Sequence, residues 1–167
     1  DFILKVIRKK KDPRETLISV VIPVFNISNE LTNCLDSLFC QTMSKDLYEV
    51  VIVDDSSTDN TFDIALRYSE NETRVRCYRL RKNCGPGIAR NKGIHEAKGR
   101  YILFLDGDDF LPKYALKNLG EIAVNQKADV ITFNWAYFNG AENSKNLEPQ
   151  RRDLKRFPDK KVELIRR

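Results

Sequence analysis

Residues 49–55 read EVVIVDD, a run of β-branched apolar residues that ends in two aspartates. An almost continuous apolar run of this length predicts a strand that is buried on both faces, as in a parallel sheet. Similar runs lie at 18–24 (ISVVIPV), 75–80 (VRCYRL), 101–106 (YILFLD) and 129–135 (DVITFNW). The sequence therefore predicts five strands of one buried sheet.

Segments with helical spacing lie between these strands. Apolar residues from Leu31 to Phe39 recur at the three- and four-residue spacing of a helix, after a candidate cap at Ser28. Weaker patterns predict helices over 62–69, over 88–97 and over 115–123, the last with Pro112 near its first turn. This alternation predicts an α/β fold: a doubly wound, mostly parallel sheet with helices on both faces.

The chain has 167 residues, 41% of them hydrophobic and 32% charged, which suits one soluble domain with a core. Its net charge of +5 divides into +3 over residues 1–15, −3 over 16–144 and +5 over 145–167. We expect a basic N-terminal flank (1–15), an α/β domain (16–140) and a basic C-terminal flank or linker (141–167). Solvated helices are the first interpretation of the flanks, and contact with an anionic membrane surface or with a partner is the alternative.

Several classes of protein are disfavoured. No apolar run reaches the roughly 20 residues that a membrane span needs. The first basic cluster follows the first apolar stretch, whereas in a signal peptide the basic residues come before it. The four cysteines form no CxxC pair, which argues against a zinc site and fits a reducing cytoplasm. The flanks lack interleaved aromatic residues, so we expect no nucleic-acid partner.

Ligands of open α/β sheets bind beyond the carboxyl ends of the strands. Four loops lie there: Pro23-Val24-Phe25-Asn26, Asp54-Asp55-Ser56-Ser57, 83–87, and Asp106-Gly107-Asp108-Asp109. The last loop brings together three carboxylates, a set that Mg²⁺ or Mn²⁺ prefers, and its glycine lets a ligand approach closely. The alternative is an ordinary turn in which Asp109 caps the next helix.

The other two polar loops also have two interpretations. Asp54 and Asp55 could accept hydrogen bonds from a base or sugar, or the loop could cap the helix that follows, with Asp55 at its positive end. Residues 83–93 combine glycines, a helix start and two cations, a plausible surface for an anion. Solvated charges at Arg90 and Lys92 are the alternative, and neither GxGxxG nor GxxxxGK[ST] is present.

Taken in order, four segments resemble glycosyltransferase family 2. They read SVVIPVFN (19–26), LTNCLDSLFCQT (31–42), YEVVIVDDSSTDNT (48–61) and GPGIARNKGIHEAKGRYILFLDGDDFL (85–111). The resemblance implies a GT-A fold with a Rossmann-like nucleotide-binding half. It also implies a metal-dependent, hexosyltransferase-type enzyme that inverts the sugar's configuration, with a UDP-sugar as the usual donor and Mn²⁺ or Mg²⁺ as cofactor.

The resemblance also implies roles for individual residues. Pro23, Val24 and Asn26 would line the nucleotide pocket, Asp54 would meet the base and Asp55 would lie beside it. Arg90 and Asn91 would shape the donor pocket. Asp106 would face the ribose and, with Asp108, form the family's DxD motif. Asp108 would bind the metal, with Asp106 and Asp109 assisting it.

The chain departs from the family pattern in two ways. Ser56-Ser57 stands where the family often has glycine-serine, and Phe25 where it often has tyrosine. Only about thirty residues follow Trp135, too few for the acceptor-binding half, and no motif for the general base is found.

The expected acceptor is a glycan or glycolipid. We expect the reaction to belong to the synthesis of surface polysaccharides or glycolipids and to take place at the inner face of the membrane. A donor-binding or scaffold module without activity of its own is the alternative. A phosphoacceptor receiver domain and a sugar nucleotidyltransferase fit less well, because the first strand is followed by neither an acidic pair nor a glycine-rich basic loop.

Overall fold

The computed structural model describes residues 4–8, 16–133 and 164–165, and the statements below concern these residues. They form one sheet with the strand order β4-β3-β2-β5-β1-β6-β7. Four neighbouring strands are parallel: β2 (Ile18–Val24), β3 (Tyr48–Asp54), β4 (Val75–Arg79) and β5 (Tyr101–Phe104). Every residue of β2 and β3 is buried, as the apolar runs predict.

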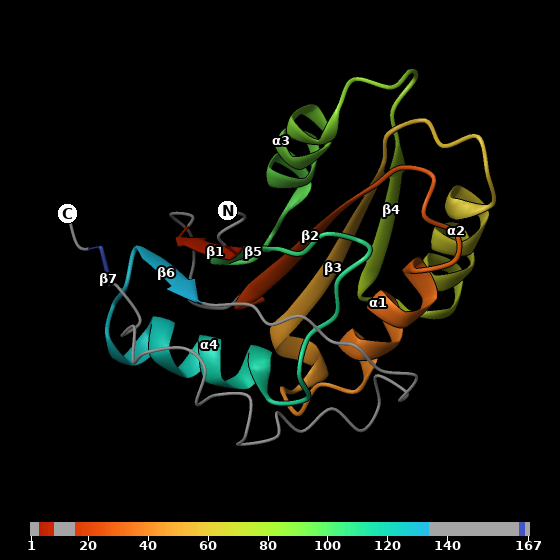
Figure 1. Ribbon diagram of the computed structural model, residues 1–167. Helices are drawn as coiled ribbons and strands as arrows, with labels where there is room; N and C mark the ends of the chain where they lie inside the picture. The colour runs from red at the N-terminus through yellow and green to blue at the C-terminus, as the bar shows by residue number, and fades with distance from the viewer. Residues whose placement is uncertain (1–3, 9–15, 134–163, 166–167) are drawn as a thin grey trace, which may run out of the picture.

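Helices cover both faces of the sheet (Figure 1). Alternate residues of β2 supply two cores: Val20 and Ile22 contribute to the larger one and Val21 to the smaller one. The larger core includes residues of α1 (Leu31–Phe39), α2 (Thr61–Asn71) and α4 (Ala115–Asn125). The smaller core lies under α3 (Pro86–Glu96), and a short 3₁₀ helix, η1 (Lys45–Leu47), precedes β3. The predicted fold class is confirmed.

The sheet also contains strands that the sequence did not predict. β1 (Leu4–Arg8) lies antiparallel between β5 and β6 (Val130–Phe133). β7 (Leu164–Ile165) pairs antiparallel with β6. The expectation of helical flanks is therefore wrong for residues 4–8 and 164–165. Residues 4–8 cover a sheet edge that β5 would otherwise leave unpaired. The proposed domain boundaries remain predictions, and Trp135 lies outside the described residues.

Two expected helix caps are absent. α1 begins at Leu31 with no side-chain cap, and Ser28 instead donates its backbone N–H to Asp59 at 3.2 Å. α4 begins at Ala115, so Asp109 is too far along the chain to cap it. All four cysteines are free thiols. Within the described part of the chain, no helix is long and apolar enough to cross a membrane.

Candidate functional site

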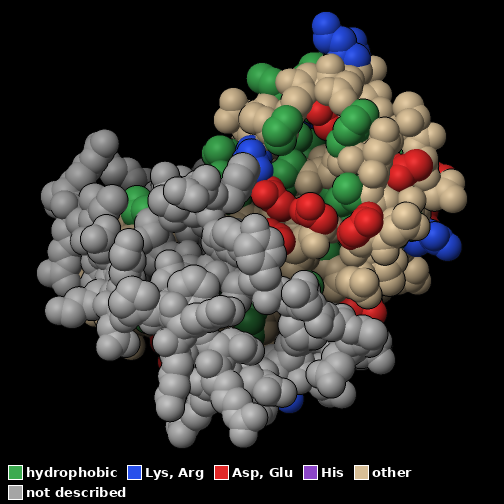
Figure 2. Space-filling view, viewed as in Figure 1, with side chains coloured by type: hydrophobic (Ala, Val, Ile, Leu, Met, Phe, Trp, Pro, Cys, Tyr) green, Lys and Arg blue, Asp and Glu red, His purple; other side chains and the backbone are tan. Residues whose placement is uncertain are grey.

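A pocket of about 320 Å³ lies where β2, β3 and β5 end and α3 begins. Such a position beyond the carboxyl ends of parallel strands is the usual ligand site of this class of fold. Its lining consists of Pro23, Val24, Phe25, Ile27, Asp55, Asn83, Gly85, Pro86, Arg90, Asp106, Gly107 and Asp108. Acidic side chains gather beside hydrophobic ones on the face that Figure 2 shows.

An ion pair joins two sides of this pocket. Arg90 on α3 places its Nη2 atom 2.7 Å from Oδ1 of Asp106, which follows β5. Both side chains are partly exposed, 21% for Arg90 and 29% for Asp106, so a ligand in the pocket could reach them. The structure thus brings together a cation and a carboxylate that lie 16 residues apart in the sequence.

Asp108 also lines the pocket, and Asp109 is an exposed neighbour outside its lining. Partial burial of its carboxyl group, and then the negative charges of Asp108 and Asp106, raise the pKa of Asp109. Among the described residues, however, no three acidic, histidine or cysteine side chains converge tightly enough to hold a metal ion. The assignment of Asp106, Asp108 and Asp109 to one ion therefore stays a prediction. One or two carboxylates with oxygens from a diphosphate still form a suitable set, because Mg²⁺ binds in that way.

The glycine of the acidic turn has a packing role. A Cβ atom on Gly107 would lie 2.4 Å from Cδ1 of Ile27 and 2.9 Å from Cγ1 of Val24. Both neighbours line the pocket, so the absence of a side chain at Gly107 lets the turn pack closely against the end of β2. The close approach that the sequence predicted is therefore made by the protein's own side chains.

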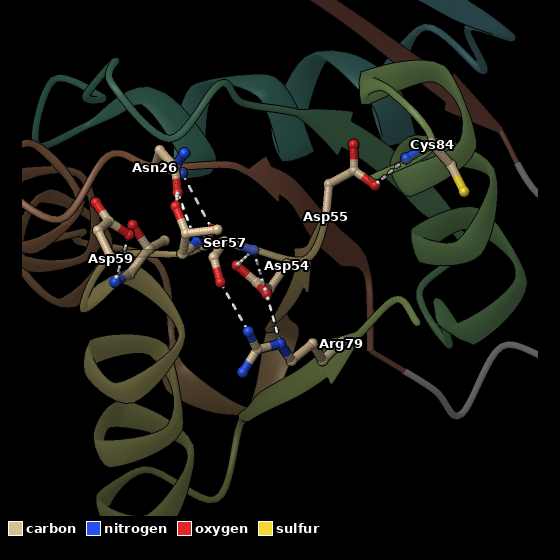
Figure 3. A network of polar contacts seen from close by, with 9 residues as sticks. Asn26, Asp54, Asp55, Ser57, Asp59, Arg79 and Cys84 are labelled. Carbon is tan, nitrogen blue, oxygen red and sulfur yellow. Dashed lines mark hydrogen bonds and ion pairs between the residues drawn. The ribbon is translucent and has the colours of Figure 1, made fainter. Parts of the chain in front are cut away.

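The two consecutive aspartates at the end of β3, Asp54 and Asp55, point in opposite directions (Figure 3). Alternation along a strand accounts for this difference. Asp55 accepts hydrogen bonds from the backbone N–H groups of Cys84 at 2.8 Å and Gly85 at 2.7 Å, next to the start of α3. The start of α3 thus binds a carboxylate of the protein itself. Asp55 lies at the start of α3, and not at the start of α2 as one interpretation of the sequence predicted.

Asp54 is enclosed and lies outside the pocket lining, contrary to the expected contact with the base. Its side chain is 0% exposed and accepts a hydrogen bond from the Ser57 N–H at 3.1 Å. Nε of Arg79 lies 3.2 Å from its Oδ2 atom. Of the two aspartates, Asp55 is the one in a position to meet a ligand.

Asn26 and Asn91 also lie outside the lining. Asn26 has a φ of +52°, and its Oδ1 atom accepts a hydrogen bond from the Thr58 N–H at 2.8 Å. Asn91 is exposed on α3. Asn26 therefore connects two loops, a role that differs from the expected contact with a nucleotide. Pro23 and Val24 do lie in the lining, as expected.

The sequence-based selection missed other residues of the pocket. Phe25 and Ile27 line it, and Phe25 is 41% exposed. An aromatic residue that directly follows a buried strand was the signal for Phe25. Ile27 gave no signal, because its place depends on the positive φ of Asn26, which redirects the chain after β2.

Ser56 should respond unusually to substitution by glycine. It has a φ of +66°, a left-handed conformation that costs an ordinary residue about 1–2 kcal/mol. We expect Ser56→Gly to raise the free energy of unfolding by about 0.5–1 kcal/mol after the extra chain entropy of glycine is deducted. Ser69→Gly, within α2, is the control and should lower it. Denaturant titrations measure both, and destabilisation by Ser56→Gly would contradict the assigned conformation.

Asp59 should make stability depend on pH under acidic conditions. Slight desolvation of its carboxyl group raises the pKa of Asp59. Hydrogen bonds from Thr61 and Ser28 outweigh this effect and lower the pKa to about 2. A lowered pKa stabilises the fold above the unfolded value of about 3.9, and this contribution disappears as the pH falls towards 2. In Asp59→Asn we expect the loss of stability between about pH 4 and 2 to shrink, by less than about 1 kcal/mol because solvent screens this exposed group. Parallel acid dependences of the two proteins would refute this expectation.

The family model for glycosyl transferase family 2 matches residues 19–165. A poly(ribitol-phosphate) beta-glucosyltransferase of Bacillus spizizenii is 40% identical over 131 residues, which cover 78% of this chain and 21% of the relative. Staphylococcus aureus TarS 1–349 in complex with UDP has a TM-score of 0.65 and 36% identity, over 68% of this chain and 34% of that one. The same TarS fragment has also been solved with UDP-GlcNAc.

A more distant structure is that of the mannosyltransferase PcManGT from Pyrobaculum calidifontis, in complex with GDP-Man and Mn²⁺. It has a TM-score of 0.60 and 25% identity, over 66% of this chain and 33% of that one. The chain thus spans about a third of each of these solved chains and about a fifth of the Bacillus relative. These likenesses confirm the expected fold.

Proposed function

The chain belongs to glycosyl transferase family 2, and from this premise we propose that it binds the donor of an inverting transferase. This transferase moves a sugar from a UDP-sugar to an acceptor hydroxyl. The observation that carries the proposal is the pocket in which Asp55, Arg90, Asp106 and Asp108 meet at the carboxyl ends of the strands. A nucleoside diphosphate needs a hydrogen-bond acceptor for its base, a cation near its phosphates and oxygen ligands for its metal. The pocket offers all three.

The base would lie at the end of the pocket formed by Phe25 and Asp55. Phe25 presents an exposed aromatic side chain on which a base could stack. Asp55 accepts hydrogen bonds from two backbone N–H groups, and a carboxylate has enough lone pairs to accept a further one from a uracil N–H. The UDP bound to TarS, at 36% identity, supports uracil as the base.

The diphosphate would lie near Arg90 and the acidic turn. Arg90 can hydrogen-bond a phosphate oxygen through its guanidinium group, because such a group offers five donors. Asp108, with Asp106 beside it, would hold Mn²⁺ or Mg²⁺, because both carboxylates line the pocket. The ion would supply positive charge that stabilises the departing nucleoside diphosphate. The Mn²⁺ bound to PcManGT supports this assignment.

The acceptor is proposed to be a glycan or glycolipid of the bacterial surface. Two poly(ribitol-phosphate) glycosyltransferases among the similar proteins support this class. The reaction also needs a base that removes the acceptor's proton, and no described residue is assigned to it. Peripheral membrane contact through the basic flanks is part of the proposal. Equal affinity of the protein for neutral and for anionic vesicles would exclude this contact.

One observation favours a second function for the isolated chain. It spans 34% of TarS 1–349, so the described pocket could bind a donor without completing transfer. A donor-binding module and a complete enzyme differ in turnover and not in nucleotide affinity.

The experiment that tests the proposal compares nucleotides and then turnover. We expect UDP with Mn²⁺ to bind more tightly than GDP or ADP, measured by calorimetric titration at equal concentrations. Release of UDP from UDP-glucose or UDP-GlcNAc then separates an active enzyme from a binding module. Failure of all three nucleotides to bind would exclude a donor site, and equal affinity for all three would exclude the proposed recognition of uracil.

A further inference from the structure

We propose that Arg79, which lies outside the pocket lining, is a positioning residue for the base-binding end of the pocket. The inference rests on the proposed function, because it assigns Arg79 an effect on UDP binding. Arg79 is the last residue of β4, and in the network that Figure 3 shows it contacts Asp54 at the end of β3 and Ser57 in the loop that follows. It would act through Asp54 and Ser57, and these in turn through the backbone of Phe25 and Asp55.

The first step is the contact between Arg79 and the loop. Its Nε atom lies 3.2 Å from Oδ2 of Asp54, and its Nη2 atom donates to the Ser57 carbonyl at 2.7 Å. The guanidinium also lies 4.7 Å from the ring centre of Phe62 on α2. One planar group thus fixes both ends of the short segment from 54 to 57, which a single hydrogen bond could not do.

The second step leads from this segment to the pocket. Ser57 accepts a hydrogen bond on Oγ from the Asn26 N–H at 3.0 Å, and Asn26 accepts one from the Thr58 N–H at 2.8 Å. Asn26 directly follows Phe25, and Asp55 directly follows Asp54. The network therefore restrains the backbone next to both pocket residues that would receive the base.

The third step is the response to removal of Arg79. The Asp54 side chain is 0% exposed, whereas the Arg79 side chain is 44% exposed. A buried carboxylate that loses its cation is strongly destabilised unless water reaches it. The loop from 54 to 58 would have to open to admit water, and this movement would displace Asp55 and Asn26. Loss of Arg79 would thus weaken UDP binding, although Arg79 lies outside the pocket lining.

The test compares two arginines of the same strand. Arg76 also pairs with a buried carboxylate, that of Glu49 at 2.7 Å, and lies near an aromatic ring, that of Tyr78, but it has no contact with the loop after β3 among those described. In calorimetric titrations of UDP with Mn²⁺, we expect Arg79→Gln to weaken binding about tenfold, as for other residues that support a site indirectly. Arg79→Lys should recover part of the affinity, and Arg76→Gln should bind as the wild type does.

Hydrogen exchange supplies a readout that does not need a ligand. Arg79→Gln should speed exchange of the backbone amides of Asn26, Ser57 and Thr58, whereas Arg76→Gln should not. Equal UDP affinity and equal exchange in wild type and Arg79→Gln would overturn the role of Arg79. Absence of UDP binding in the wild type would overturn the proposed function instead, and the exchange data would still decide whether Arg79 orders the loop.

Discussion

Arg90→Met is expected to weaken the binding of UDP about a hundredfold. The substitution keeps the length of the side chain but removes the guanidinium that lies 2.7 Å from Asp106 and faces the pocket. Asp106 then stays close to Asp108 without its cation, and the diphosphate loses a hydrogen-bond donor. Truncating one partner of a partly buried charge pair costs about 2–5 kcal/mol, and 3 kcal/mol corresponds to about a hundredfold in affinity.

Lys92→Gln is the matched control for this prediction. Lys92 lies on the same helix, and its ion pair with Glu96 is 2.6 Å long, but it is outside the pocket lining. We expect the control to change UDP affinity less than twofold. A similar loss in both variants would show that the overall charge of α3, and not the Arg90–Asp106 pair, governs binding.

Glu49→Leu is expected to lower the free energy of unfolding by about 3–5 kcal/mol. Glu49 is buried and accepts hydrogen bonds from Ser19 and the Lys98 N–H, both at 2.6 Å, and from Arg76 at 2.7 Å. Leucine would leave these donors without their acceptor and would leave a charge without its partner. Because domains are stable by only about 5–15 kcal/mol, this is a large share of the total.

Glu72→Leu is the control, because the Glu72 side chain is 35% exposed and lies 3.4 Å from Arg74. We expect it to change stability by less than about 1 kcal/mol. Chemical denaturation measures both variants, and a cost below 1 kcal/mol for Glu49→Leu would mean that the buried network contributes little.

Much of the fold could be predicted because it depends on local patterns. The cores of the runs ISVVIPV and EVVIVDD are β-branched and almost continuously apolar, which favours strands covered on both faces. The position of the pocket followed from the rule that ligands bind beyond parallel strands, and Asp106 and Asp108 were found in this way.

Other features depend on contacts between distant segments, which periodicity does not report. The five-residue strand β1 pairs with residues about a hundred positions away, and nothing in its own sequence reveals that partner. Asp54 and Asp55 are adjacent and chemically identical, but their side chains point to opposite sides. Asp54 is therefore buried in an ion pair with Arg79, whereas Asp55 lines the pocket. Alternation along β3 could have separated them, since Asp54 falls on the side of Val50 and Ile52.

The measurement that tests the central claim most directly is a calorimetric titration of UDP into the protein with Mn²⁺, with EDTA, and with the variant Asp108→Ala. We predict binding that requires the metal and that Asp108→Ala weakens at least tenfold. Because Asp108 is an exposed residue of the pocket lining, the substitution should leave the fold intact. Binding that is unchanged by EDTA and by Asp108→Ala, or no binding with Mn²⁺ present, would contradict a metal-assisted donor site at the acidic turn.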